Sequence, residues 1–318
     1  MSQSFILYFI FYILFFTFII QSGSSLRVER EVWSYKNPDS WTGLCKSGKR
    51  QSPVDIEEGS AGGKKTNFLA FHFGRTYDID LSFKAVNDGT TLVITTVNRT
   101  RPYMEGGGLS GRFIFKEIRL HWDAEHSING VRDPLEVQFI HFNSKFKDVE
   151  SARKNKNGIV ILSVLCEEKI ERNKMTPFIR GALEQEEHRR LYNDNQELLL
   201  HKVITKLRNL LPASILEFYR YEGSMTSPGC EENVVWTIFR KKMVVHPQTI
   251  MELKAMKTSA NVTMPKSSRP VQPLNGRDVV LGIGNLKSDT GGAVVGMIKE
   301  KAIYIYLMSI LYIIMNIK

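Results

Sequence analysis

Residues 116–122, Lys-Glu-Ile-Arg-Leu-His-Trp, and residues 135–143, Leu-Glu-Val-Gln-Phe-Ile-His-Phe-Asn, decide the fold of this chain. In both stretches apolar and polar residues alternate, and β-branched and aromatic residues are frequent. This pattern is typical of β-strands. The sequence therefore predicts two strands here, joined by a short connection.

Four polar side chains of these strands are expected to form one patch. Residues two apart on a strand point to the same face. Arg119 and His121 are therefore predicted on one face, and Glu136 and Gln138 likewise share a face. If the strands are neighbours, the four side chains converge.

This pair of strands resembles the zinc-binding centre of the α-class carbonic anhydrases, where a His-x-His-Trp strand is followed by a Glu-x-His-x-x-His-x-Asn strand. In that family three histidines hold the metal. Their positions here are Arg119, His121 and Gln138, so one ligand of three is kept. The chain is more closely similar to the carbonic anhydrase-related proteins, which have lost the metal and the reaction. The resemblance thus implies degenerate ligand positions, no zinc and no other cofactor.

Two further motifs extend the resemblance over most of the chain. Residues 48–56 read Gly-Lys-Arg-Gln-Ser-Pro-Val-Asp-Ile, and residues 269–277 read Arg-Pro-Val-Gln-Pro-Leu-Asn-Gly-Arg. Both are similar to characteristic segments of the family. The family fold implies a single domain over residues 30–280. It is mostly β with peripheral helices, around a large twisted, mainly antiparallel central sheet.

Other residues match family positions around the metal. Thr226 matches the threonine that accepts from the zinc-bound hydroxide and donates to a buried glutamate, which corresponds to Glu125. Ser227 matches the neighbouring substrate-side hydroxyl, and Glu136 the carboxylate that orients a ligand histidine. The connection from His121 to Glu125 is shorter than is usual in the family. Without a metal, Thr226, Ser227 and Glu125 are expected to be vestigial.

Arg119 is expected to replace the charge of the lost metal. An acidic pocket without zinc would leave Glu125 or Glu136 buried and unpaired, which is costly. We therefore expect the guanidinium of Arg119 to pair with one of these two carboxylates.

Two of the three cysteines match a disulfide position. Extracellular members of the family carry a bridge that corresponds to Cys45 and Cys230. Closing so long a loop stabilises the fold by roughly 4–5 kcal/mol in the chain-entropy model. The alternative is two buried free thiols. Cys166 follows the apolar run 159–165 and is expected to be a buried strand thiol.

The N-terminus indicates the secretory route. Residues 4–20 are almost wholly apolar and small polar residues follow, so residues 1–24 are predicted to be a signal peptide, with an uncleaved anchor as the alternative. Asn98 and Asn261 begin Asn-x-Thr glycosylation acceptors. We expect a secreted or extracellular glycoprotein.

The C-terminal tail, residues 281–318, lies beyond the family domain. Its segment 302–315 is strongly apolar but shorter than a comfortable membrane span. Small residues upstream of it fit a lipid-anchor signal, which would attach the protein to a membrane at the cell surface. The alternative is a poorly ordered tail without function.

The long charged segment Thr176–Leu211 shows helical spacings and predicts one or two helices. Residues 215–221 and 233–239 predict strands on either side of the loop that carries Thr226. His141 is separated from Gln138 by an odd number of positions, so it is expected to face away as a structural histidine.

The charge and the motifs are compatible with two classes of function. The formal net charge is +10, but the basic residues are scattered, which argues against nucleic acid as a partner. The preferred interpretation is an inactive recognition module that binds an extracellular or cell-surface protein. The alternative is a zinc-dependent carbonic anhydrase of weak activity, which would need His72 or His126 as an additional ligand.

Overall fold

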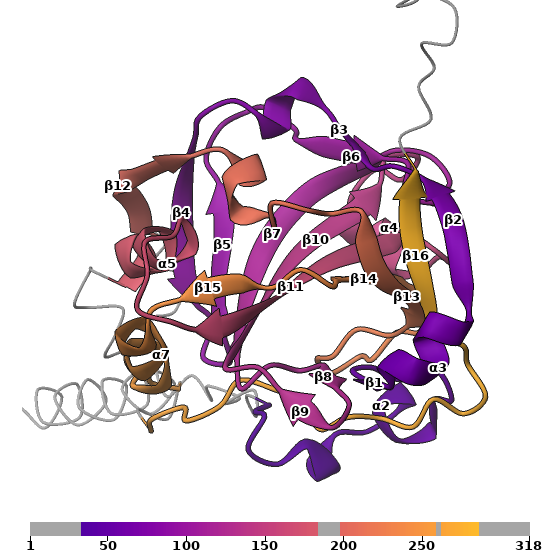
Figure 1. Ribbon diagram of the computed structural model, residues 1–318. Helices are drawn as coiled ribbons and strands as arrows, with labels where there is room; N and C mark the ends of the chain where they lie inside the picture. The colour runs from indigo at the N-terminus through magenta and orange to yellow at the C-terminus, as the bar shows by residue number, and fades with distance from the viewer. Residues whose placement is uncertain (1–32, 184–197, 259–261, 286–318) are drawn as a thin grey trace, which may run out of the picture. The chain divides into compact units, whose positions relative to one another are not determined.

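The computed structural model describes residues 33–183, 198–258 and 262–285. Ser34 begins the compact unit that holds every element described below, and Met1–Trp33 is a separate unit of which only Trp33 is described. Figure 1 shows a large twisted sheet with short helices at its periphery. The predicted fold class is confirmed.

The strands of this unit are mostly short. In chain order they are β1 (Asp55–Ile56), β2 (Lys65–Leu69), β3 (His72–Phe73), β4 (Leu81–Asn87), β5 (Leu92–Thr96), β6 (Tyr103–Glu105), β7 (Phe113–Trp122), β8 (Ser127–Ile128), β9 (Val131–Arg132), β10 (Leu135–Asn143), β11 (Ile159–Glu168), β12 (Leu198–Thr205), β13 (Glu217–Gly223), β14 (Val234–Phe239), β15 (Met243–Val245) and β16 (Val280–Asn285).

The described helices are short as well. The α-helices are α2 (Leu44–Ser47), α3 (Glu58–Gly63), α4 (Val149–Arg153), α5 (Met175–Leu183) and α7 (Pro247–Lys254), and the 3-10 helices are η1 (Pro38–Ser40), η2 (Arg75–Tyr77) and η3 (Leu207–Leu210).

The main sheet has the strand order β12-β4-β5-β7-β10-β11-β14-β13-β16-β2. Most neighbours are antiparallel, whereas β11 pairs in parallel with β14 and β15, and β16 with β2. Strands β3 and β6 extend the sheet beside β7, and β1, β8 and β9 form a small second sheet. Strands β7 and β10 therefore lie near the middle of the main sheet (Figure 1).

The two strands predicted from the opening motifs are confirmed as neighbours. In their antiparallel pairing Arg119 lies opposite Gln138, and His121 lies opposite Glu136. Every residue of β10 is buried, because protein covers both faces of the central sheet. This register places the four polar side chains on adjacent strands, as the alternation predicts.

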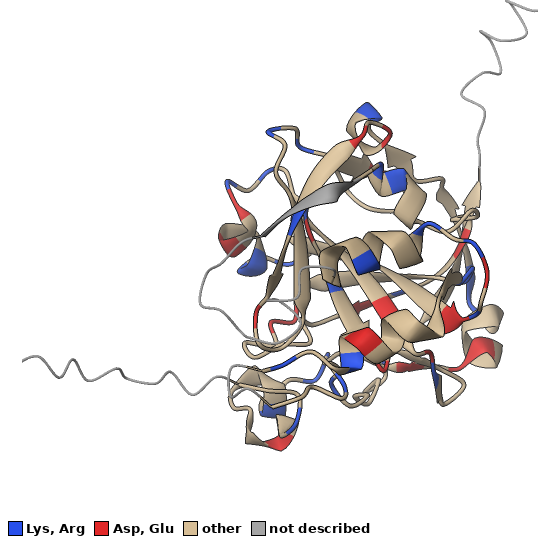
Figure 2. Cartoon of the chain, turned by 90° about the vertical axis from the view of Figure 1, so that its left-hand side faces the viewer, with Lys and Arg blue, Asp and Glu red and all other residues tan. Residues whose placement is uncertain are grey.

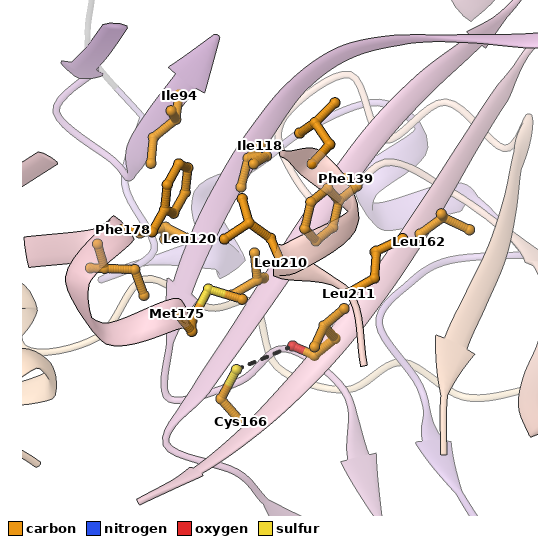
Figure 3. Close-up of a cluster of buried hydrophobic side chains, with 14 of the residues drawn as sticks. Ile94, Ile118, Leu120, Phe139, Leu162, Cys166, Met175, Phe178, Leu210 and Leu211 are labelled. Carbon is orange, nitrogen blue, oxygen red and sulfur yellow. Dashed lines mark hydrogen bonds between the residues drawn. The ribbon is translucent and has the colours of Figure 1, made fainter. Parts of the chain in front are cut away.

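A large apolar cluster packs on one face of this sheet (Figure 3). Its labelled members are Ile94, Ile118, Leu120, Phe139, Leu162 and Cys166 from the strands, Met175 and Phe178 from α5, Leu210 from η3, and Leu211. Each large side chain that is fully buried contributes about 1.5–3 kcal/mol. Cys166 is the buried strand thiol that was predicted, and burial raises its pKa so that it stays protonated.

The segment Thr176–Leu211 differs from the prediction. Its first part is helical, as α5, but Leu198–Thr205 forms strand β12, which pairs antiparallel with β4 at the edge of the sheet. The β-branched run Val-Ile-Thr at the end of β12 suits a strand, and pairing with β4 outweighs the helical preference of the leucines. The predicted helix is wrong there.

Several smaller predictions are confirmed. The strands expected at 215–221 and 233–239 are β13 and β14. Cys45 and Cys230 form a disulfide. His141 is fully buried and bonded to Tyr77 and to the carbonyl of Phe139, as a structural histidine should be.

Some predictions fall outside the described residues. These include the signal peptide at residues 1–24, Asn261, and most of the tail at 281–318. Asn98 is described and is exposed after β5. Within the described ranges, no helix has the length and apolar character needed to cross a bilayer.

Candidate functional site

Arg119 on β7 is held by two acidic side chains. One is Glu117 on the same strand, and the other is Asp88 in the turn between β4 and β5. Its Nε donates to Glu117 Oε1 at 2.8 Å, and its Nη1 donates to Asp88 Oδ2 at 3.2 Å. Burial lowers the pKa of Arg119, but the attraction of Glu117 and Asp88 more than compensates and raises it. The guanidinium is therefore a fixed cation.

The expected pairing of Arg119 with Glu125 or Glu136 is wrong. Glu117 lies two residues before Arg119 on the same strand and so shares its face, which makes it a nearer partner. The turn between β4 and β5 brings Asp88 to the other side of the guanidinium. The side chain of Arg119 remains 25% exposed in this ion-pair cluster.

His121 keeps one ring nitrogen without a partner. Its Nδ1 lies 2.7 Å from the carbonyl oxygen of Ser267, an arrangement in which Nδ1 carries the proton and donates. On this assignment Nε2 carries the lone pair, and it is buried with no hydrogen-bond partner. The nearest charged group to it is Glu125, whose Oε2 is 3.8 Å away. One imidazole nitrogen with a free lone pair is thus buried at this position.

Gln138 is tied to both buried glutamates. Its Nε2 donates to Glu125 Oε2 at 2.9 Å and to Glu136 Oε1 at 3.0 Å. The backbone N–H of Arg269 also donates to Glu125, at 3.1 Å to Oε1. An amide, rather than a metal or a guanidinium, therefore joins the two carboxylates.

Glu136 lies at the start of a buried hydrogen-bond chain. It accepts from the backbone N–H and Nδ1 of His126 and from the hydroxyl of Ser163. His126 Nε2 lies 2.7 Å from the Tyr221 hydroxyl, which donates to Ser52 Oγ at 2.9 Å. Burial alone would raise the pKa of Glu136, but the charge and hydrogen bonds of His126 lower it to about 2. Glu136 is thus a permanently ionised, fully paired carboxylate.

The loop residues Thr226 and Ser227 lie between β13 and β14. Thr226 is buried and shares a side-chain hydrogen bond with Tyr35, whereas Glu125 accepts hydrogen bonds from Gln138 and Arg269. Ser227 is partly exposed, and its carbonyl accepts from the Cys230 N–H in the turn that carries the disulfide.

Tyr35 is a site residue that sequence reasoning missed. It is only 4% exposed, and its ring meets the His121 ring edge-on with centroids 5.9 Å apart. Burial, followed by the charge of Glu125, raises the pKa of Tyr35 well above its ordinary value, so the phenol stays neutral. The aromatic character of residues 33–41 was the one available signal, and it does not indicate which ring reaches the site.

The donor set does not match a three-ligand zinc site, which takes neutral imidazole, thiolate or carboxylate ligands. Arg119 is cationic, and Gln138 offers an amide. Across the described ranges, no three His, Cys, Asp or Glu side chains are grouped so that they could hold a metal ion.

The two histidines considered as substitute ligands are engaged elsewhere. His126 uses both ring nitrogens in the Glu136–Tyr221 chain. His72 is exposed on β3 and contacts Glu105 at 3.1 Å. Neither is brought to His121 as a further metal ligand.

Comparison with known proteins gives a consistent family assignment. Residues 36–282 match the family pattern of the eukaryotic-type carbonic anhydrases. The chain is similar to putative carbonic anhydrase 5 of Caenorhabditis elegans, at 27% identity over 78% of this chain and 80% of that protein. It is also similar to carbonic anhydrase 6 of Mus musculus, at 29% identity over 80% of this chain and 82% of that protein. This protein therefore belongs to the carbonic anhydrase family.

Proposed function

We propose that this protein is a carbonic anhydrase homologue without hydratase activity, which acts outside the cell as a recognition module. The observation that carries the first part is the state of the three ligand positions. Arg119 is a cation locked onto Glu117 and Asp88, Gln138 is an amide bonded to two glutamates, and His121 alone offers a free nitrogen.

The chemistry of hydration explains why this arrangement matters. In the enzymes, the metal lowers the pKa of its bound water to about 7 and so supplies hydroxide at neutral pH. A guanidinium cannot bind a metal, because all its nitrogens are donors. Glu125 and Glu136, which would support metal and ligands, both accept hydrogen bonds from protein donors. We therefore expect neither stoichiometric zinc nor turnover.

The extracellular part of the proposal rests on other features. The Cys45–Cys230 disulfide requires an oxidising compartment to persist. The apolar start of the chain and the exposed acceptor at Asn98 agree with that route. Basic and acidic residues are interspersed along the described chain in Figure 2, which favours a protein partner over nucleic acid. The partner is proposed to be an extracellular or cell-surface protein, with membrane attachment through the tail.

A hydration assay with a matched gain-of-ligand variant tests the loss of catalysis. The wild-type chain and the variant Arg119→His/Gln138→His are purified alike, supplied with zinc, and assayed for carbon dioxide hydration. We expect no turnover above the zinc-containing buffer for the wild type. Zinc-dependent hydration by the wild type, abolished by a chelator, would refute the proposal.

The secretory route is tested separately in cultured eukaryotic cells. We expect the full-length chain in the medium or on the cell surface, with a glycosidase-sensitive mass that Asn98→Gln reduces. Retention of an unglycosylated chain in the cytosol would contradict an extracellular role.

One observation favours the alternative, a zinc enzyme of weak activity. His121 Nε2 is buried without a partner and lies 3.8 Å from Glu125 Oε2, so two potential donors face each other. If this pair binds zinc, His121→Ala should remove any zinc and activity found in the wild type. A wild type that has neither would eliminate this alternative.

A further inference from the structure

A buried arginine on β13 has no counter-ion among the residues that the structure describes. Arg220 is only 8% exposed and shares a sheet face with Phe218, two residues before it. Its Nε donates to Thr237 Oγ1 at 3.0 Å. Its guanidinium carbon lies 5.0 Å from the ring centroid of Phe218 and 5.6 Å from that of Phe68. Two aromatic rings and a hydroxyl thus surround the cation.

The far end of the Arg220 guanidinium lacks hydrogen-bond acceptors among the described residues. Nη2 is buried and has no hydrogen-bond partner, and among the described residues no carboxylate forms an ion pair with Arg220. Burial lowers the pKa of Arg220 to about 10, so the group is still protonated at neutral pH. The protein therefore carries an uncompensated positive charge in an apolar setting.

Another buried arginine shows what a satisfied guanidinium looks like in this fold. Arg269 is 3% exposed, and its two terminal nitrogens donate to Gln51 Oε1, the Ser52 carbonyl and the Cys45 carbonyl. Arg220 has no equivalent set of acceptors. A buried charge without a partner is strongly unfavourable, so a group that supplies the missing negative charge would bind with a strong electrostatic advantage.

We propose that the terminal edge of the Arg220 guanidinium is a binding site for a small monovalent anion. A guanidinium N–H binds an anion by a charge-assisted hydrogen bond. The small exposed fraction of Arg220 limits the ligand to a halide or a group of carboxylate size. Aromatic surroundings favour a weakly hydrated anion, because a strongly hydrated one pays more to leave water.

This site is separate from the degenerate metal centre. Adjacent strand residues face opposite sides of a sheet, and Tyr221 belongs to the hydrogen-bond chain that reaches Glu136 through His126. Arg220 faces the other way, toward Phe68 and Phe218. The anion site goes beyond the proposed function, and its test does not depend on that function.

Bromide is the probe for the solution test. The full-length chain is unfolded thermally and with denaturant in rising sodium bromide, with ionic strength kept constant by sodium fluoride, whose strongly hydrated anion is a poor ligand here. At a bromide concentration about nine times its Kd, the equilibrium constant for unfolding of the wild type should fall about tenfold.

Two variants give the comparison. Arg220→Met should abolish this saturable response. Arg208→Met removes another arginine that stacks on a phenylalanine, Phe73, but is exposed, and it should leave the response intact. Equal responses in the wild type and Arg220→Met, or loss of the response in Arg208→Met, would overturn the proposal.

A second measurement needs no variant and so does not depend on the folding of Arg220→Met. Wild-type crystals soaked in sodium bromide should show an anomalous-scattering peak within hydrogen-bonding reach of the terminal nitrogens of Arg220. The absence of a peak there, in crystals that show bromide at other surface positions, would contradict the site.

Discussion

Arg119 shows how a cation is accommodated at the position where the family resemblance predicts a metal ligand. Its guanidinium bonds Glu117 and Asp88 rather than Glu125 or Glu136. Glu125 and Glu136 are instead satisfied by Gln138, His126 and the Arg269 amide. Several hydrogen-bond donors, rather than the guanidinium of Arg119, are therefore distributed over both carboxylates.

Removing Arg119 should destabilise the fold moderately. Arg119→Ala leaves Glu117 and Asp88 partly buried without their cation, so we expect the free energy of unfolding to fall by about 1–2 kcal/mol. Equilibrium denaturation in urea measures it. Arg240→Ala is the matched control, since Arg240 pairs with Glu217 at the surface, where such pairs contribute about 0–1 kcal/mol. Equal stability of Arg119→Ala and the wild type would contradict the ion-pair cluster.

The residue scale also shows what the sequence can and cannot reveal. Glu117 was foreseeable as the partner of Arg119, because the period of two puts both on one face. Asp88 and Tyr35 were not, since each reaches the site from a distant part of the chain. Such contacts depend on sheet order and on the path of the N-terminal segment, neither of which local alternation encodes.

Among the elements, strand β10 carries a strong electrostatic coupling. Glu136 has its pKa lowered to about 2 from an ordinary 4.5, mainly because His126 opposes the effect of burial. The unfolded chain therefore takes up a proton at this group between about pH 4.5 and pH 2, whereas the native state does not. The stability that Glu136 contributes is complete above about pH 4.5 and is lost as the pH falls toward 2.

The variant His126→Gln should weaken this coupling. Without the imidazole, the native pKa of Glu136 rises toward its ordinary value, so the acid-dependent loss of stability becomes shallower. Stability at pH 7 should fall by roughly 2–4 kcal/mol, because a buried network is broken. Urea unfolding from pH 7 to pH 2.5 measures both effects. His72→Gln, at an exposed histidine, is the control, and a His126→Gln profile parallel to the wild type would refute the coupling.

The sequence predicts some of the strands correctly and misses another. Strands β7, β10, β13 and β14 follow from alternation and β-branched residues. Strand β12 does not, because its leucines and its charged neighbours also suit a helix and only pairing with β4 decides the outcome. A strand at the edge of a sheet gains its stability from a partner far away in sequence, so a local pattern underestimates it.

At the scale of the whole molecule, the disulfide links the N-terminal segment to the loop that carries Thr226. Cys45 and Cys230 are 185 residues apart, so the bridge closes a very long loop. In the chain-entropy model, removing it costs about 5 kcal/mol. Cys45→Ser/Cys230→Ser should therefore unfold at much lower denaturant concentration than the wild type.

A reducing agent supplies the control for this prediction. Reductant should lower the stability of the wild type toward that of the double variant and leave the variant unchanged. A wild type and double variant of equal stability under oxidising conditions would show that the bridge does not hold the fold together. The pairing itself was foreseeable only through family resemblance, because three cysteines alone allow other pairings.

Zinc stoichiometry is the most direct test of the account, whose central claim is that a cation and an amide have replaced two metal ligands. The wild type and Arg119→His/Gln138→His are dialysed against the same zinc-containing buffer, passed through a desalting column, and analysed for metal per chain. The account predicts no stoichiometric zinc in the wild type and a marked gain in the variant, where three imidazoles can meet. One tightly held zinc per wild-type chain, lost in His121→Ala, would contradict it.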